Sequence, residues 1–309
     1  MRGWRTENAV AWSLLAAIAA AVAAGDARGA VVVRDGFGDA DRNNDGTTDG
    51  ATATDVGDVG GAWWKAKTSS GQTFTVVDDA AGLGSGLALD VAPVSTTGPT
   101  AILNFTAVTL NDGDELRASF DARVTTAIPN PGSDRRFRWG LFNTAGAPKT
   151  SDGGTSADTI NKHFGYIARV DLGTESTTGN TFSVDENSTV AAALLSSTDT
   201  LDTTQDPAGA ITDTDARSFS LSLKRIGDDL IVTGTHDGLT VSQSLVEAGT
   251  TPLTFTYDEF AIGMNGFAAG FRFDNFVLEY LPVTVPEPGA AGLVAATTAA
   301  ALTRRQRRQ

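Results

Sequence analysis

Apolar and polar residues alternate with a period of two along most of this sequence. The clearest run places Leu116, Ala118, Phe120, Ala122 and Val124 on one face and polar or charged residues on the other. Successive side chains of a β-strand point to opposite faces, so this run predicts a strand with one buried and one solvated face. Similar runs recur between clusters of Gly, Asp, Asn and Thr, and together they predict an all-β chain of about a dozen strands.

Local turn signals add detail to this pattern. Short Gly and Asp turns at 226–229 and 236–238 link three runs into a predicted meander. The apolar phase of the last run, 271–280, slips at Asp274-Asn275, which predicts a β-bulge. Two stretches rich in Thr, Ser, Asp and Gly, 148–161 and 199–215, are expected to be surface loops.

Charge and cysteine content limit the function classes. The chain carries 23 Lys and Arg against 37 Asp and Glu, for a net charge of −14. An acidic surface repels nucleic acid and anionic lipid headgroups and suits divalent cations, so we expect no nucleic-acid partner. The chain has no cysteine, which excludes thiol catalysis and cysteine-bound metals.

The amino end has the three parts of a secretory signal, and we assign it to residues 1–29. Arg2 and Arg5 form a basic start, residues 9–24 are apolar apart from Ser13, and small residues follow as cleavage points. The apolar run is shorter than the roughly 20 residues that span a bilayer. The alternative, a buried helix, would pack poorly because the run is rich in Ala. Removal by signal peptidase leaves residues 30–281 as one β-sandwich domain.

The carboxyl end, residues 282–309, has a second three-part arrangement. A Pro-Glu-Pro sequence precedes a short apolar run of Ala, Leu, Val and Thr, predicted as a short hydrophobic helix, and a basic cluster ends the chain. An apolar run followed by arginines would lodge in a membrane with the arginines on the cytoplasmic side. The residues that carry the pattern are Pro286, Glu287, Pro288, Arg304, Arg305, Arg307 and Arg308.

This ending resembles the PEP-CTERM sorting signals of exported bacterial proteins. The resemblance implies recognition by an exosortase, removal of the tail after a transient stay in the membrane, and delivery to the cell surface or extracellular matrix. The alternative is an end without function in which the Pro-Glu-Pro and arginine strings occur by chance.

A second resemblance covers the middle of the chain. An Asp-rich opening with Phe37, then Trp63-Trp64, then the 116–124 run and the final 271–280 run follow in this order. The order is similar to that of concanavalin A-like lectin/glucanase (LamG-like) jelly rolls in secreted bacterial proteins. It implies a two-sheet antiparallel jelly-roll sandwich.

The opening of the domain contains a candidate calcium loop. Oxygen-bearing residues alternate around Gly46, which supplies a sharp turn, and the Thr47 carbonyl falls at the seventh position. Position twelve is Thr52, not the bidentate Glu of a helix-loop-helix hand, so a helix-free structural calcium site is expected, and a solvated turn is the alternative. The predicted ligands are Asp41, Asn43, Asp45, Thr47 and Asp49. Asp274 is a further candidate, with a local Asx-type turn as the alternative.

Catalytic patterns find no support. Jelly-roll glucanases carry Glu-x-Asp-x-x-Glu on one strand, and the sequence contains no such spacing. Asp258 and Glu259 are expected to be a solvated edge pair, and His163 and His236 lie too far apart in the sequence to suggest a motif. Catalysis is therefore left open but unsupported.

A polar face is the candidate ligand surface. Asp121, Arg123, Arg136 and Arg138 occupy polar positions of two successive runs and, on adjacent strands, would place carboxylates beside guanidinium groups. With exposed aromatic residues nearby, such as Trp63, Trp64 or Tyr166, this face would bind sugar hydroxyls. The alternative is cross-strand charge pairing with the aromatic residues in the core.

These observations favour an exported, surface-sorted, calcium-requiring sandwich that binds exopolysaccharide or another glycan without catalysis. Two alternatives remain, a polysaccharide-degrading enzyme and a purely structural surface or matrix component.

Overall fold

The computed structural model describes residues 29–38, 42, 61–66, 72–84, 86–92, 100–128, 135–152, 163–173, 181–188, 194–195, 198–205, 210–265 and 269–283. Gly29–Leu281 form one compact unit. Apart from Gly29, Pro282 and Val283, the predicted signal and sorting segments lie outside the described residues, and so do Pro286, Glu287, Pro288 and the terminal arginines. Within those residues no helix is long and apolar enough to cross a membrane.

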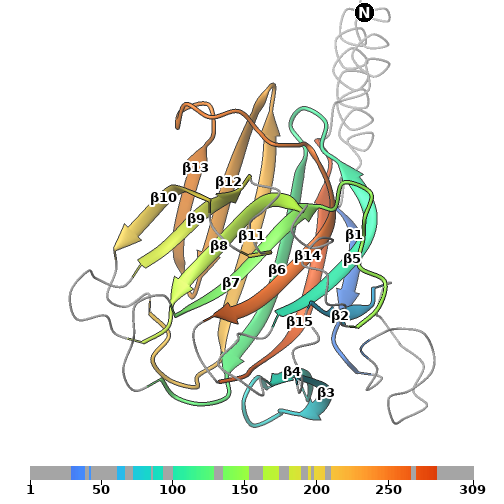
Figure 1. Cartoon of the computed structure of the whole chain (residues 1–309), viewed down its shortest axis with the longest axis vertical. Coiled ribbons are helices and arrows are strands. Elements are labelled where there is room, and N and C mark those ends of the chain that lie inside the picture. The colour runs from blue at the N-terminus through green and yellow to red at the C-terminus, as the bar shows by residue number, and fades with distance from the viewer. Residues whose placement is uncertain are drawn as a thin grey trace, which may run out of the picture. The chain divides into compact units, whose positions relative to one another are not determined.

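The strands form two antiparallel sheets, which confirms the predicted all-β sandwich (Figure 1). The eight-stranded sheet runs in the order β13 (Leu239–Ser244), β12 (Asp229–His236), β11 (Arg217–Ile226), β6 (Glu115–Val124), β15 (Phe271–Leu281), β4 (Leu87–Ala92) and β3 (Thr73–Asp78), and β1 (Ala30–Asp35) also pairs with β15. The seven-stranded sheet runs in the order β10 (Asp199–Gln205), β9 (Thr181–Asn187), β8 (Phe164–Asp171), β7 (Arg136–Asn143), β14 (Thr256–Asn265), β5 (Thr100–Thr109) and β2 (Trp63–Lys65).

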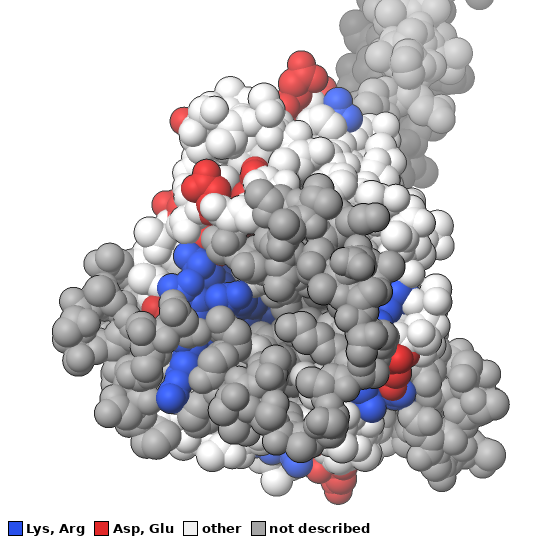
Figure 2. Space-filling model, in the orientation of Figure 1, with Lys and Arg blue, Asp and Glu red and all other residues white. Residues whose placement is uncertain are grey.

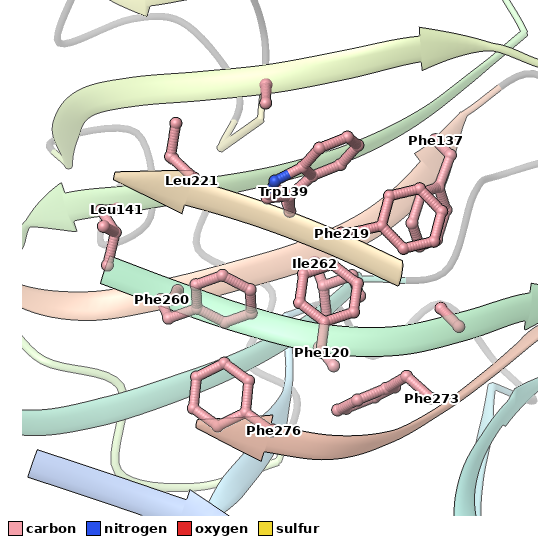
Figure 3. Packing of buried hydrophobic residues seen from close by; sticks show 14 of the residues in the cluster. Phe120, Phe137, Trp139, Leu141, Phe219, Leu221, Phe260, Ile262, Phe273 and Phe276 are labelled. Carbon is pink, nitrogen blue, oxygen red and sulfur yellow. The ribbon is translucent and has the colours of Figure 1, made fainter. Parts of the chain in front are cut away.

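Aromatic side chains from both sheets meet in the core (Figure 3). Phe120 of β6 stacks on Phe219 of β11 at 5.3 Å between ring centroids and meets Trp139 of the other sheet edge to face at 6.1 Å. Such aromatic pairs add about 0.5–1.5 kcal/mol each beyond the area that they bury. Burial leaves the Trp139 indole N–H in need of an acceptor, and the Ser220 carbonyl supplies it at 3.1 Å. The sandwich is therefore held by a continuous apolar layer, in which the Trp139 indole N–H has its acceptor.

The predicted alternation is confirmed along β6, where every second residue is buried. The predicted meander is confirmed as β11, β12 and β13, which pair in sequence order. The predicted bulge is also confirmed, because the pairing of β15 with β6 shifts between Asp274 and Val277. Asn275 takes a φ of 54° there, in the left-handed region that Asn tolerates better than most residues.

Three expectations were wrong in detail. The stretch 199–215, expected to be a loop, contains β10, which pairs with β9. The alternation there is weak because β10 contributes few apolar residues to the core. Trp63 and Tyr166 were candidates for exposed sugar platforms, yet both are fully buried. The described residues contain fifteen strands, not about a dozen, because short strands such as β2 carry too few residues to show a period.

Candidate functional site

Of the predicted calcium ligands, the structure describes Asp274 alone. Asp41, Asn43, Asp45, Thr47 and Asp49 lie outside the described residues. Asp274 is described and buried at the β15 bulge, where its Oδ1 accepts the N–H of Asn275 at 2.6 Å. Its strand does pair with β1, as expected for the first and last strands. This bond joins neighbouring residues, whereas an Asx turn joins residues two apart. The described residues hold no group of three or more His, Asp or Glu able to bind a metal.

The four candidate ligand residues do not share one face. Asp121 and Arg123 are on β6 of the eight-stranded sheet, whereas Arg136 and Arg138 are on β7 of the seven-stranded sheet. The expectation that these two strands are adjacent is wrong, because the chain crosses from one sheet to the other between them. The two pairs therefore lie on the opposite outer faces of the sandwich, and each belongs to its own polar cluster.

The outer face of the eight-stranded sheet carries an open cleft of about 760 Å³. Arg123 of β6 and Arg272 of β15 lie on it, since both alternate with core residues of their strands. The turn that follows β3 and the segment that precedes β11 complete the lining. The lining residues are Asp78, Asp79, Ala80, Ala81, Gly82, Arg123, Thr214, Asp215, Ala216 and Arg272.

An ion-pair network fixes the guanidinium groups of the cleft. Arg123 Nε donates to Asp79 Oδ2 at 2.7 Å, and its Nη2 donates to Asp79 Oδ1. Arg272 Nη1 donates to the same Oδ1 at 2.6 Å, and its Nε donates to Asp90 at 2.7 Å. Asp79 is 4% exposed, while the arginines are 16% and 26% exposed. The carboxylate is therefore buried beneath two guanidinium groups that reach the cleft.

Gly82 makes room for this network. Its N–H donates to the carbonyl of Asp79 at 2.8 Å in the turn after β3. A Cβ at this position would lie 2.2 Å from Arg123 Nε and 2.6 Å from Asp79 Oδ2. Only glycine lets the turn approach the ion pair so closely.

Some polar atoms of the cleft residues make no hydrogen bond within the described part of the chain. Within the described part of the chain, Arg123 Nη1 and Arg272 Nη2 have no hydrogen-bond partner, and neither has the side chain of Asp215. Hydrogen bonding from Arg123 lowers the pKa of Asp79 below its ordinary 3.8, against the opposing effect of burial. Asp79 is thus ionised at neutral pH and holds both arginines in place.

Asp121 lies two residues before Arg123 on the same outer face. It accepts hydrogen bonds from Ser218 Oγ at 2.5 Å and from Asn275 Nδ2 at 3.0 Å. These bonds tie β6 to β11 and to the bulge of β15. Asp121 does not line the cleft.

The second pair of candidate residues belongs to an arginine layer on the outer face of the seven-stranded sheet. Arg136 Nε donates to Asp171 at 3.1 Å, and Arg138 Nη1 donates to the carbonyl of Leu195 at 2.6 Å. The first contact is a cross-strand charge pair of the kind named above as the alternative to ligand binding. Arg169 of β8, which the sequence did not single out, joins this layer through Asp185 at 2.6 Å.

Sequence reasoning was wrong about Glu259. It is fully buried on central strand β14, and its Oε1 lies 2.9 Å from Nδ1 of His163, which is 1% exposed. His163 Nε2 lies 3.2 Å from the Ala147 carbonyl. Burial lowers the pKa of His163, but the Glu259 carboxylate more than offsets this, so the net direction is upward. The pair ties β14 to the segment before β8, 96 positions apart, which no local motif could reveal.

The carboxyl groups whose pKa is raised lie away from the cleft. A general acid at neutral pH needs a raised pKa. Burial raises the pKa of Asp185, Glu186 and Glu259, but all three belong to the seven-stranded sheet and are at most 8% exposed. The pKa of the cleft carboxyl Asp79 is shifted in the opposite direction.

No protein-family model and no curated protein matches this chain. Among solved structures it is similar to lectin II from Ulex europaeus, at 12% identity and a TM-score of 0.41 over 72% of this chain and 94% of that one. It is similar to the metal-free carbohydrate recognition domain of Emp46p, at 10% identity and a TM-score of 0.42 over 72% and 89%. It is also similar to an endo-1,3-beta-glucanase from Streptomyces sioyaensis, at 9% identity and a TM-score of 0.48 over 82% and 97%.

Proposed function

We propose that this chain is an exported, non-catalytic glycan-binding β-sandwich, and that the cleft at Arg123 and Arg272 holds the saccharide. The single observation that carries the proposal is the pair of guanidinium groups fixed by one buried carboxylate at the floor of an open cleft. Small-molecule sites of known proteins measure about 300–1,000 Å³, and the cleft falls within this range.

The chemistry of the cleft fits a molecule rich in hydroxyl groups. Each sugar hydroxyl both donates and accepts a hydrogen bond. Arg123 Nη1 and Arg272 Nη2 supply donors, and the exposed carboxylate of Asp215, in the segment before β11, supplies an acceptor. Since the Asp79 network already holds the arginines, little side-chain freedom is lost when a ligand binds. Donors and acceptors in one cleft favour a neutral saccharide over a simple anion or cation.

The test is retention of polysaccharide by the purified chain on an array, with release of reducing ends measured in the same wells. The proposal predicts retention without release. Asp215→Ala and Arg272→Gln should each weaken retention, whereas Arg117→Gln should not. Arg117 is a matched control because it lies on the outer face of the same sheet, 43% exposed and paired with Glu279, outside the cleft lining.

Other outcomes favour the alternatives. Release of reducing ends would contradict the non-catalytic proposal and favour a polysaccharide-degrading enzyme. Absence of retention on every polysaccharide would favour a structural surface or matrix component.

Export and surface sorting complete the proposal. The amino-terminal signal and the Pro-Glu-Pro, apolar and arginine tail support an address outside the cell, reached through signal peptidase and an exosortase. A host that processes the tail should yield a mature chain lacking residues after the Pro-Glu-Pro sequence, whereas Glu287→Ala should retain them. Mass spectrometry of the extracellular protein would show whether the tail is present. An intact tail in both the parent and Glu287→Ala would contradict sorting.

Calcium binding by the 41–49 loop is a separate part of the proposal. The support is the alternation of oxygen ligands around Gly46. A ligand that binds only the folded state raises stability by mass action. Titrated calcium should therefore raise the melting temperature of the parent but not of Asp45→Ala. An equal rise in the melting temperature of both proteins would contradict a calcium site in this loop.

A further inference from the structure

A short segment that follows β7 is tied to two strands of the seven-stranded sheet by polar side chains. We call this segment, residues 144–149, the strap. At its start, the N–H and the hydroxyl of Thr144 donate to Asp258 of β14 at 2.8 and 2.7 Å. At its end, the carbonyl of Lys149 accepts a hydrogen bond from the amide of Asn104 on β5. The strap is therefore attached at both ends by side chains of the sheet.

The middle of the strap meets a buried pair of titratable groups. Figure 2 shows charged groups of both signs side by side on the described surface, where water weakens their attraction. His163 and Glu259 differ from these, because their side chains are only 1% and 0% exposed. Nδ1 of His163 lies 2.9 Å from Glu259 Oε1, and Nε2 lies 3.2 Å from the carbonyl oxygen of Ala147 in the strap. Both ring nitrogens therefore face oxygen atoms.

These two contacts require one proton more than a neutral histidine and a carboxylate hold together. A neutral imidazole carries a single N–H, and a backbone carbonyl such as that of Ala147 can only accept a hydrogen bond. Both contacts are hydrogen bonds when the imidazole is a cation. Both are also satisfied when a neutral imidazole is protonated on Nε2 and a protonated Glu259 donates to Nδ1. Either form holds the same extra proton.

Two other charged groups of the described residues act on the pair, Asp258 of β14 and Lys149 of the strap. Burial raises the pKa of Glu259 by more than the contact with His163 lowers it. Burial lowers the pKa of His163, but the contact with Glu259 more than offsets this, so the net direction is upward. Asp258 raises both pKa values, and Lys149 lowers that of Glu259. The extra proton is therefore present below the ordinary histidine pKa of 6.5 and is lost as the pH rises through the raised value.

We propose that His163 and Glu259 form a proton-dependent latch, which holds the middle of the strap while the extra proton is bound and releases it when that proton is lost. After the loss, one N–H remains on the imidazole. Glu259 retains it, because an ionised carboxylate is the stronger acceptor and its Oε2 has no hydrogen-bond partner in the described part of the chain. Nε2 and the Ala147 oxygen are then two acceptors that repel each other. The latch goes beyond the proposed function, because it belongs to the other sheet from the cleft.

Hydrogen exchange of the purified chain, followed by mass spectrometry, tests the latch. Protection factors of peptides that cover the strap would be corrected for the intrinsic exchange rate and compared from about pH 6 to about pH 10. We expect the protection of the strap to fall by about tenfold over this range, the effect of losing one hydrogen bond to a charged group. The central strand β6 is the internal reference and should keep its protection. Constant protection of the strap would overturn the latch.

Glu259→Gln should abolish the pH response. The new amide can donate to Nδ1 of a neutral imidazole whose Nε2–H serves Ala147, so both contacts form without an extra proton. Protection of the strap should then stay constant over the same pH range. Glu247→Gln is the matched control, because it removes an equal charge from an exposed position after β13 and should respond as the parent does. An equal fall in Glu259→Gln would overturn the latch and assign the response to Lys149.

NMR of the imidazole nitrogens gives a second measurement, which needs no variant to fold. The chain has only two histidines, so the ring signals are few. Nε2 of His163 should carry a proton at about pH 6, and at about pH 10 the remaining proton should be on Nδ1. A proton that stays on Nε2 over the whole range, or is absent from it at about pH 6, would overturn the latch.

Discussion

Replacing Gly82 with alanine tests whether the Asp79 network holds the cleft together. The added Cβ would lie 2.2 Å from Arg123 Nε and 2.7 Å from its Cζ, which no unmoved side chain can accommodate. The guanidinium must therefore move and lose its two hydrogen bonds to Asp79. Gly82 has no left-handed φ, so the substitution adds no backbone strain.

The expected loss in free energy of unfolding follows from these two hydrogen bonds. Hydrogen bonds to charged groups contribute about 1.5–3 kcal/mol each, and partial exposure places this pair near the lower end. Replacing glycine also removes freedom from the unfolded chain, which stabilises by about 0.4–1 kcal/mol. The net loss in free energy of unfolding should be about 2–3 kcal/mol, read from the urea midpoint at an unchanged slope.

The pH dependence sharpens the test. The folded-state pKa of Asp79 lies below its ordinary 3.8, so its contribution is present above that value and disappears as the pH falls through the folded pKa. The difference between parent and Gly82→Ala should thus be full at neutral pH and shrink below about pH 3.8. Gly38→Ala is the control, because a Cβ there meets nothing within 4 Å. A loss no larger than in Gly38→Ala, or one that persists in acid, would refute the reasoning.

Three further predictions concern the core, the buried pair and the bulge. Phe120→Ala should lower the free energy of unfolding in urea by about 3–5 kcal/mol, because it empties a buried site. Val246→Ala, at an exposed position, should lower it by less than about 0.5 kcal/mol, and similar losses in the two variants would contradict the assigned core. Glu259→Gln leaves His163 without its anionic partner and should cost about 3–5 kcal/mol below the ordinary histidine pKa of 6.5. Because the folded-state pKa of His163 is raised, this cost should diminish as the pH rises through it, and a cost independent of pH would disprove the pair. Asn275→Val should cost about 1–2 kcal/mol more than Asn275→Gly in thermal or urea unfolding, since only the latter tolerates the left-handed φ of 54°, and equal stabilities would argue against the bulge geometry.

The period of two was enough to predict the longer strands and their buried faces, but not β10 or short strands such as β2. Phe120 faces the core because its neighbours in sequence, Ser119 and Asp121, are polar or charged, and burial of apolar surface then fixes the orientation. The slip at Asp274-Asn275 likewise predicted the bulge, since an extra residue is the simplest way to restore the apolar phase in one strand. These features depend on local sequence, which is why a single chain sufficed.

The sequence pattern did not predict which strands pair. β6 and β7 follow each other in the chain, yet they belong to different sheets, so residues expected to meet are separated by the core. Conversely, Arg272 and Asp79 lie 193 positions apart and meet in the cleft. Alternation could have placed Arg272 on an outer face, opposite Phe271 and Phe273. It carries no information about which distant carboxylate would face it.

Arginine footprinting tests the central claim most directly. The polysaccharide retained most strongly by the chain would be added before treatment with phenylglyoxal, and modified arginines would be located by peptide mass spectrometry. Binding in the cleft predicts protection of Arg272, which is 26% exposed, and continued modification of Arg117, which is 43% exposed on the same sheet. Protection of Arg117 with no change at Arg272 would contradict the account.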